Sequence, residues 1–122
     1  RAPSKPLRRA FLTTVAIASI AASAQAQTGN DLLGWCNSYA TQSSSDPAGV
    51  GFERGLCAGY IAALLNTMTI APVYGMRVCG KGITYWQAKD VVHKWLLTNP
   101  QDRHRPASAL VVVALYEAFA CR

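Results

Sequence analysis

The sequence predicts an all-α fold: a small four-helix domain of two antiparallel helical hairpins, stapled by disulfides. Apolar residues recur at helical spacing in four segments, and proline, glycine and asparagine separate these segments. Four cysteines fall into two pairs that are nearly symmetric about the two predicted turns. With 122 residues, the chain is long enough for one domain with a modest core.

The first helix is expected over residues 31–39, close to the start of the predicted domain. Asn30 can cap it, and Asp31 suits the positive end of the helix dipole. Its shared apolar face is expected to consist of Leu32, Cys36 and Tyr39.

The second helix is expected over residues 47–68, because Asp46-Pro47 has the pattern of a cap and a first turn. Gly55 and Gly59 lie inside it, and a glycine costs a helix up to about 1 kcal/mol relative to alanine. Together with Ala58 and Ala62 they predict the close approach of another helix or of the helix's own disulfide partner. The expected apolar stripe is Phe52, Leu56, Tyr60, Ala63 and Leu64.

Residues 69–78 link the two hairpins and are broken by Pro72 and Gly75. The segment is unusually apolar for a linker. Two interpretations remain open: it covers the core as a lid, or it forms a contact surface. The apolar residues of this linker are Ile70, Val73, Tyr74, Met76 and Val78.

The third helix is expected to begin after Thr84, which stands three residues before Gln87 as in a capping box. Asp90 and Lys94 are expected to pair at i,i+4 on its polar face. The apolar stripe consists of Ala88, Val91, Val92, Trp95 and Leu96. Trp86 and Trp95 are interpreted as core aromatics rather than as a ligand pocket.

Asn99-Pro100 should end the third helix, because proline disfavours helical geometry in the residue before it. A fourth helix is expected over residues 106–118, with Pro106 in its first turn. Its expected stripe is Leu110, Val111, Ala114, Leu115 and Ala118.

The cysteine positions predict two disulfides among three connectivities. Antiparallel geometry places Cys36 beside Cys57 in the first hairpin and Cys79 beside Cys121 in the second. In the chain-entropy model each bond stabilises the fold by roughly 3–4 kcal/mol. No C-x-x-C pair is present, so we expect no metal site and no cofactor.

Residues 1–26 have the pattern of an export signal, which leaves residues 27–122 as a single domain. An apolar run from Ala10 to Ala22 follows several basic residues, and Ala24-Gln25-Ala26 is an A-x-A cleavage site. The run is too short to predict a stable membrane anchor. Arg8-Arg9 also resembles a twin-arginine signal, and Sec export is the alternative. The expected location is the periplasm.

Charge and motifs argue against nucleic-acid binding and against catalysis. The formal net charge is +6, but removing the four basic residues before residue 10 leaves only +2 on the rest, without a dense basic patch. His93 and His104 are accompanied by no carboxylate pair, nucleophile motif or metal motif. With the cysteines committed to disulfides, we expect no enzyme.

The chain contains a series of different short motifs in a defined order. They are Asn30-Asp31-Leu32-Leu33 before Cys36, Cys57-Ala58-Gly59-Tyr60-Ile61, Gly82-Ile83-Thr84 with Gln87, Asn99-Pro100 with Arg103-His104, and Ala114-Leu115 with Glu117-Ala118-Phe119 and Cys121. In this order the chain resembles the Rap/Tai-type immunity proteins of bacterial type VI secretion systems. It departs from them at Ala120, where the family often has proline.

The resemblance implies an all-helical periplasmic protein, in a family whose members are often dimeric, that blocks a peptidoglycan amidase by occluding its active site. The alternative is a general periplasmic stress or chaperone-like helical protein with no toxin partner. Because the helix cores use most large apolar side chains, the expected partner-binding residues are those left in the linker and the last turn. These residues are Tyr74, Met76, Arg77, Arg103 and His104.

Signal cleavage after Ala26 is the first testable prediction. The intact mass of the exported protein should correspond to a chain that begins at Gln27, within a residue or two. A mature product that retains Phe11 and Leu12 would contradict the cleavage site.

Overall fold

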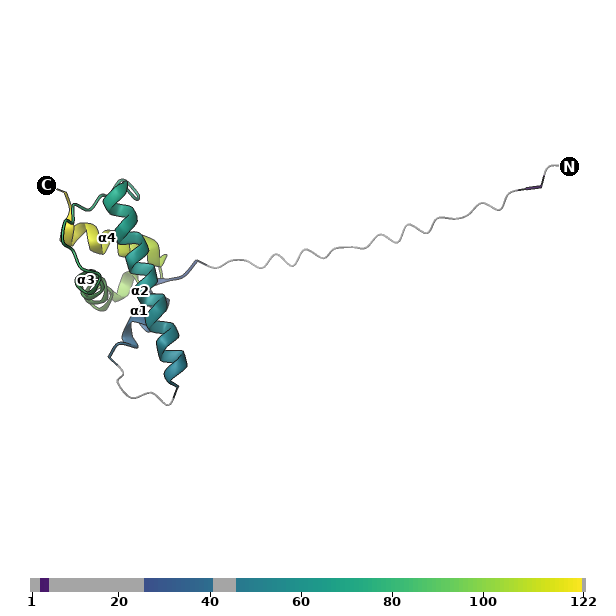
Figure 1. Ribbon diagram of the computed structural model, residues 1–122, viewed down its shortest axis with the longest axis horizontal. Helices are drawn as coiled ribbons and strands as arrows, with labels where there is room; N and C mark the ends of the chain where they lie inside the picture. Colours follow the sequence, from purple (N-terminus) through teal and green to yellow (C-terminus); the bar gives the residue numbers. More distant parts are fainter. Residues whose placement is uncertain (1–2, 5–25, 41–45, 122) are drawn as a thin grey trace.

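The computed structural model describes residues 3–4, 26–40 and 46–121. Its α-helices are α1 (Gly29–Asn37), α2 (Pro47–Ile70), α3 (Tyr85–Thr98) and α4 (Ala107–Phe119), with a short 3₁₀-helix η1 (Pro100–Asp102) between the last two (Figure 1). Within these described ranges there are isolated β-bridges but no strands. The predicted all-α, four-helix fold is confirmed. Most of the predicted export signal, residues 1–2 and 5–25, lies outside the described residues.

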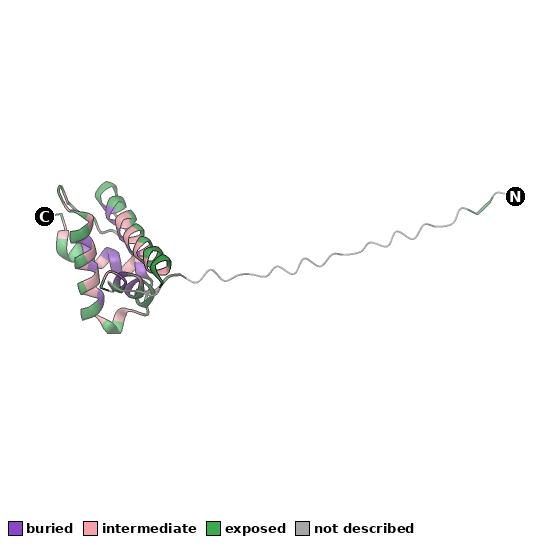
Figure 2. Ribbon diagram, turned by 60° about the horizontal axis from the view of Figure 1, so that its bottom comes forward, coloured by how far each residue is buried: buried purple, intermediate pink, exposed green. Residues whose placement is uncertain are grey.

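The core lies where the four helices meet, and every pair of α-helices is in contact (Figures 1 and 2). α2 is the longest helix, and only one side of it is buried. By length and composition alone it could cross a membrane, but here it packs against α1, α3 and α4. The core residues are Leu32, Leu33, Cys36, Cys57, Ile61, Leu65, Met68, Val78, Ala88, Val92, Leu96, Ala107, Leu110, Val111, Val112, Ala114 and Leu115.

Both predicted disulfide pairings occur in the structure. Cys36 bonds to Cys57 with their Cα atoms 5.1 Å apart, and Cys79 bonds to Cys121 with their Cα atoms 4.6 Å apart. The first disulfide is buried in the core, whereas both cysteines of the second are exposed.

The start of α1 differs from the prediction, because its cap is Thr28 rather than Asn30. The Thr28 hydroxyl accepts from the Asp31 N–H at 3.3 Å, and the Asp31 carboxylate accepts from the Thr28 N–H at 2.8 Å. These hydrogen bonds also lower the pKa of Asp31. The N–H of Asn30 instead donates to the Arg103 carbonyl at 2.9 Å, so tertiary contact begins the helix two residues earlier than expected.

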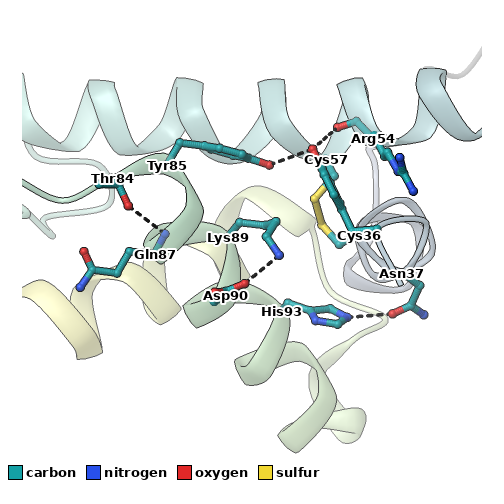
Figure 3. A network of polar contacts seen from close by, with 11 residues as sticks. Cys36, Asn37, Arg54, Cys57, Thr84, Tyr85, Gln87, Lys89, Asp90 and His93 are labelled. Carbon is teal, nitrogen blue, oxygen red and sulfur yellow. Dashed lines mark hydrogen bonds and ion pairs between the residues drawn. A yellow bond between two sulfur atoms is a disulfide. The ribbon is translucent and has the colours of Figure 1, made fainter. Parts of the chain in front are cut away.

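The predicted caps of α2 and α3 are present. Asp46 accepts from the Gly49 N–H at 3.0 Å, and the Thr84 hydroxyl accepts from the Gln87 N–H at 3.2 Å. Only this half of the predicted capping box forms, since the Gln87 side chain extends away from Thr84 (Figure 3).

The predicted buried face of α2 is only partly right, because Tyr60 and Leu64 pack against the core but are not fully buried. Phe52 is 69% exposed and Ala63 is exposed, while the buried residues are Cys57, Ile61, Leu65 and Met68. Because α2 is apolar around most of its circumference, helical periodicity alone does not select one face. The disulfide at Cys57 selects it instead.

The close approach predicted at the small residues of α2 does not occur at Gly55 or Gly59. Gly55 and Gly59 are exposed, and a Cβ atom added to either would meet no atom within 4 Å. These glycines therefore lie on the outer side of the helix.

Two details of the second hairpin also differ from the predictions. Asp90 forms its ion pair with Lys89, at 2.7 Å, instead of with Lys94. Lys89 is held close because its side chain is only 14% exposed. Ala118, expected in the stripe of α4, is exposed near the end of the helix.

The cap of α3 provides a stability test. Thr84→Ala leaves the Gln87 N–H without its acceptor, so we expect unfolding to require about 1 kcal/mol less free energy. Chemical denaturation of the oxidised protein measures this difference.

Thr67→Ala is the matched control. It removes an exposed hydroxyl that donates within α2 to the Ala63 carbonyl, at 2.8 Å, and leaves no helix-start amide unsatisfied. Its effect should stay within about 0.5 kcal/mol. Equal denaturation midpoints for Thr84→Ala and the parent would exclude the cap as a source of stability.

Candidate partner-binding site

A short β-hairpin with a two-residue turn projects from the linker between α2 and α3. Val73 and Met76 exchange two backbone hydrogen bonds, each 2.9 Å long, around Tyr74 and Gly75. Both central residues have positive φ, 51° at Tyr74 and 74° at Gly75, as in the type I′ turns that suit hairpins. The linker is therefore an ordered projection with a defined tip.

Tyr74 occupies the tip in a conformation that tyrosine rarely adopts. Its ring is 67% exposed, and the left-handed backbone region costs a residue with a Cβ about 1–2 kcal/mol. Backbone strain of this kind concentrates at functional sites. The combination of an exposed aromatic ring and an unfavourable backbone makes Tyr74 the leading candidate for a contact residue.

The base of the hairpin is fixed to the rest of the domain. The Val78 N–H donates to the Met68 carbonyl at 3.2 Å, and the Cys79 N–H donates to the Phe119 carbonyl at 3.2 Å. Val78 is buried, and Val73 and Met76 pack against the core. Both interpretations of the linker thus apply, to different residues: Val78, Val73 and Met76 cover the core, while Tyr74 and Arg77 face outward.

A cavity of about 500 Å³ lies beside the hairpin, between the last turns of α2 and residues 77–83. Arg77 directly follows the hairpin in the sequence and also lines this cavity, and Lys81 adds a second positive charge to the lining. Sequence reasoning missed Lys81, because only the folded chain brings it beside α2. The lining residues are Leu65, Asn66, Thr69, Arg77, Val78, Cys79, Gly80, Lys81, Gly82 and Ile83.

Arg103 and His104 lie in the turn at the opposite end of the α3–α4 hairpin from Cys79. The 14 residues of α3 span about 21 Å, so the structure does not bring these two residues together with Tyr74 and Arg77. Arg103 is half-buried under α1, and its carbonyl accepts from Asn30. His104 is exposed. Of the predicted residues, Tyr74, Met76 and Arg77 lie together on the hairpin, where Met76 packs against the core and Tyr74 and Arg77 are exposed.

An aromatic and cationic cluster joins α1, α2 and α3 near the buried disulfide. Tyr39 meets Trp86 edge-to-face with ring centroids 5.7 Å apart, and Lys89 Nζ lies 5.1 Å from the Tyr39 centroid. The Arg54 guanidinium donates to the Ser38 carbonyl at 3.0 and 3.1 Å. Trp86 is 58% exposed, so its assignment to the core was wrong.

Tyr85 and His93 of α3 extend this cluster, and both make polar contacts. Figure 3 shows Tyr85 of α3 reaching toward α2, and His93 reaching Asn37 at 2.8 Å. Burial and the hydrogen bond with Tyr39 raise the pKa of Tyr85. Burial, followed by the nearby Lys89 charge, lowers the pKa of His93. The contacts are internal to the domain, which gives the cluster a structural role.

A second, more open cavity of about 290 Å³ lies between α3 and α4. Trp95 lines it and donates its indole N–H to Glu117 at 2.9 Å. Among the described residues, no three His, Cys, Asp or Glu side chains are placed to hold a metal ion. The described residues therefore form surfaces suited to contact with other molecules, namely the hairpin and the two cavities.

The comparisons with known proteins identify one family. The family model described as Rap1a immunity proteins matches residues 28–121, which is nearly all of the predicted mature chain. Searches of curated proteins and of solved structures find no match.

The lowered pKa of His93 predicts a pH dependence of stability. The unfolded chain binds a proton on this side chain at higher pH than the folded chain does, so the folded state loses stability as the pH falls below about 6.5. His93→Gln should flatten the decline in unfolding free energy between pH 7.5 and pH 5. Denaturant titrations across this range measure it.

His104→Gln is the control, because it changes an exposed histidine in the distant turn. It should leave the slope of stability against pH close to that of the parent. An unchanged slope in His93→Gln would show that protonation of His93 does not contribute to the pH dependence of stability.

Proposed function

We propose, from the premise that this chain belongs to the Rap1a immunity protein family, that it protects its bacterium by binding and neutralising a secreted toxin. The family match over residues 28–121 is the observation that carries this proposal. In its finer form, the toxin is a peptidoglycan amidase delivered by a type VI secretion system, and the chain occludes its active site. The protein acts by binding and has no catalytic role.

The proposed location is the periplasm. Two disulfides fit an oxidising compartment. Residues 1–26 are then a cleaved export signal, by the Sec or the twin-arginine route, and residues 27–122 form the immunity domain. A peptidoglycan substrate is accessible in the same compartment, so inhibitor and toxin would meet there.

The hairpin around Tyr74 is the proposed contact with the toxin. A narrow, ordered projection with an aromatic tip can enter a catalytic cleft and exclude the substrate. Tyrosine and arginine anchor interfaces well, since each covers a large area and still makes directional hydrogen bonds. Tyr74 and Arg77 are both exposed on this projection. Arg103 and His104, at the far turn, would contact only a partner large enough to span the domain.

The chaperone-like alternative is favoured by one observation, the exposed large apolar side chains at the two ends of α2, Phe52 and Ile70. Suppression of aggregation of an unrelated unfolding protein would support it. A homodimer also remains a prediction, and light scattering of the mature chain measures its mass.

Tyr74→Asn tests the proposed contact. Asparagine tolerates positive φ, so this change removes the ring without adding backbone strain. We expect binding of the toxin, recovered from periplasm with the mature chain as bait, to weaken by at least about 2 kcal/mol. The melting temperature should change little, and calorimetry measures both quantities on one sample.

Phe52→Ser is the matched control. Phe52 is as exposed as Tyr74 but lies near the other end of α2, roughly 27 Å from Ile70. It should leave toxin binding unchanged. A fall in melting temperature for Tyr74→Asn with intact binding would refute the proposed contact.

A further inference from the structure

We propose that the cavity between α2 and residues 77–83 binds a carboxylate group. The carboxylate belongs either to an acidic side chain on a protein partner or to a small free peptide. The first source rests on the proposed function, since it makes the cavity part of the toxin interface. The second source does not depend on any toxin.

The charge of the cavity wall supports an anionic ligand. Arg77 and Lys81 both line it, and no aspartate or glutamate does. The ion pairs found among the described residues are Lys89–Asp90 and Arg105–Asp102, so neither cation of the cavity is neutralised there. Two positive charges that share a concave wall attract an anion more strongly than the same charges on a flat surface.

Two residues of the cavity wall also have backbone N–H groups that are free to donate. Residues Gly80 to Ile83 form a β-turn in which the Ile83 N–H donates to the Gly80 carbonyl at 3.3 Å and Gly82 has φ 90°. Within the described part of the chain, the N–H groups of Lys81 and Gly82 donate to no protein acceptor. Backbone N–H groups beside arginine or lysine are a common receptor for carboxylates.

The C-terminal end of α2 does not cancel this attraction. A helix end carries a partial negative charge of about one half, against two full positive charges from Arg77 and Lys81. Carbonyl groups of its last turns also already accept hydrogen bonds. Asn66 accepts from the Thr69 hydroxyl, Thr67 from the Ala71 N–H, and Met68 from the Val78 N–H.

The size of the cavity points to a carboxylate attached to a larger group. About 500 Å³ falls within the range of small-molecule sites and exceeds what one carboxylate fills. The wall is preorganised, because Cys79 is joined to Cys121 and the Val78 and Cys79 amides are hydrogen-bonded to α2 and α4. A peptide segment of a few residues would fit this description.

An NMR titration of the oxidised, ¹⁵N-labelled mature chain tests the proposal. The probes are acetyl-Gly-Glu-Gly-amide, with an internal acidic side chain, and acetyl-Ala-Ala, with a free terminal carboxylate. Acetyl-Gly-Gln-Gly-amide is the neutral control. We expect saturable shifts of the Lys81 and Gly82 amide signals with at least one acidic probe and none with the neutral peptide.

Matched variants locate the site. Lys81→Gln should weaken binding of the acidic probe about tenfold, which is the loss of one charge-assisted hydrogen bond. Lys94→Gln makes the same change on the other cavity and should leave binding unchanged. Shifts that survive in Lys81→Gln, or that the neutral peptide reproduces, overturn the proposal, as does the absence of shifts with both acidic probes.

The two acidic probes separate the sources of the carboxylate. Tighter binding of the internal glutamate identifies a side chain of a protein partner, whereas tighter binding of acetyl-Ala-Ala identifies a free peptide end. Since neither probe requires the toxin, a negative titration leaves the immunity function standing. Failure to recover a toxin would likewise leave a positive titration standing.

Discussion

Cys57 lies fully buried in the middle of a helix that is apolar around most of its circumference. Its bond to Cys36 sets the rotation of α2 about its own axis, so that Ile61, Leu65 and Met68 turn inward with it. Once that rotation is fixed, Met68 receives the Val78 N–H and the linker is held in place. The position of the hairpin therefore depends on a covalent bond that the shorter helix α1 makes to the same face of α2.

Features encoded in adjacent residues could be predicted from the sequence. The caps at Asp46 and Thr84, the helix end at Asn99 and the cysteine pairing each depend on a short pattern or on simple hairpin symmetry. The buried face of α2 could not be predicted, because its hydrophobicity has little periodic variation. The cap at Thr28 was missed for a different reason: the turn around Arg103 supplies acceptors that begin α1 early.

In the candidate site, too, some features could be predicted from the sequence and others depend on the folded chain. The linker was identified from its composition, and Tyr74 is exposed as a contact residue must be. The left-handed geometry at Tyr74 could be seen only in the folded chain. The same is true of the cavity beside Arg77, because Lys81 and Asn66 come to line one cavity only when α2 and the second disulfide are in place. Arg103 and His104 were grouped with Tyr74 by chemistry alone, and the length of α3 separates them.

The conformation of Tyr74 bears on how this position could change over generations. A chain filtered for stability alone would drift toward glycine, asparagine or aspartate there, since each tolerates positive φ at lower cost. Because Tyr74 is exposed, packing gives no reason for a tyrosine at this position. Neither backbone preference nor packing therefore accounts for a tyrosine at this position, which leaves contacts made by the ring itself. If the ring makes the proposed contact with a partner, position 74 is where the demands of recognition and of folding oppose each other.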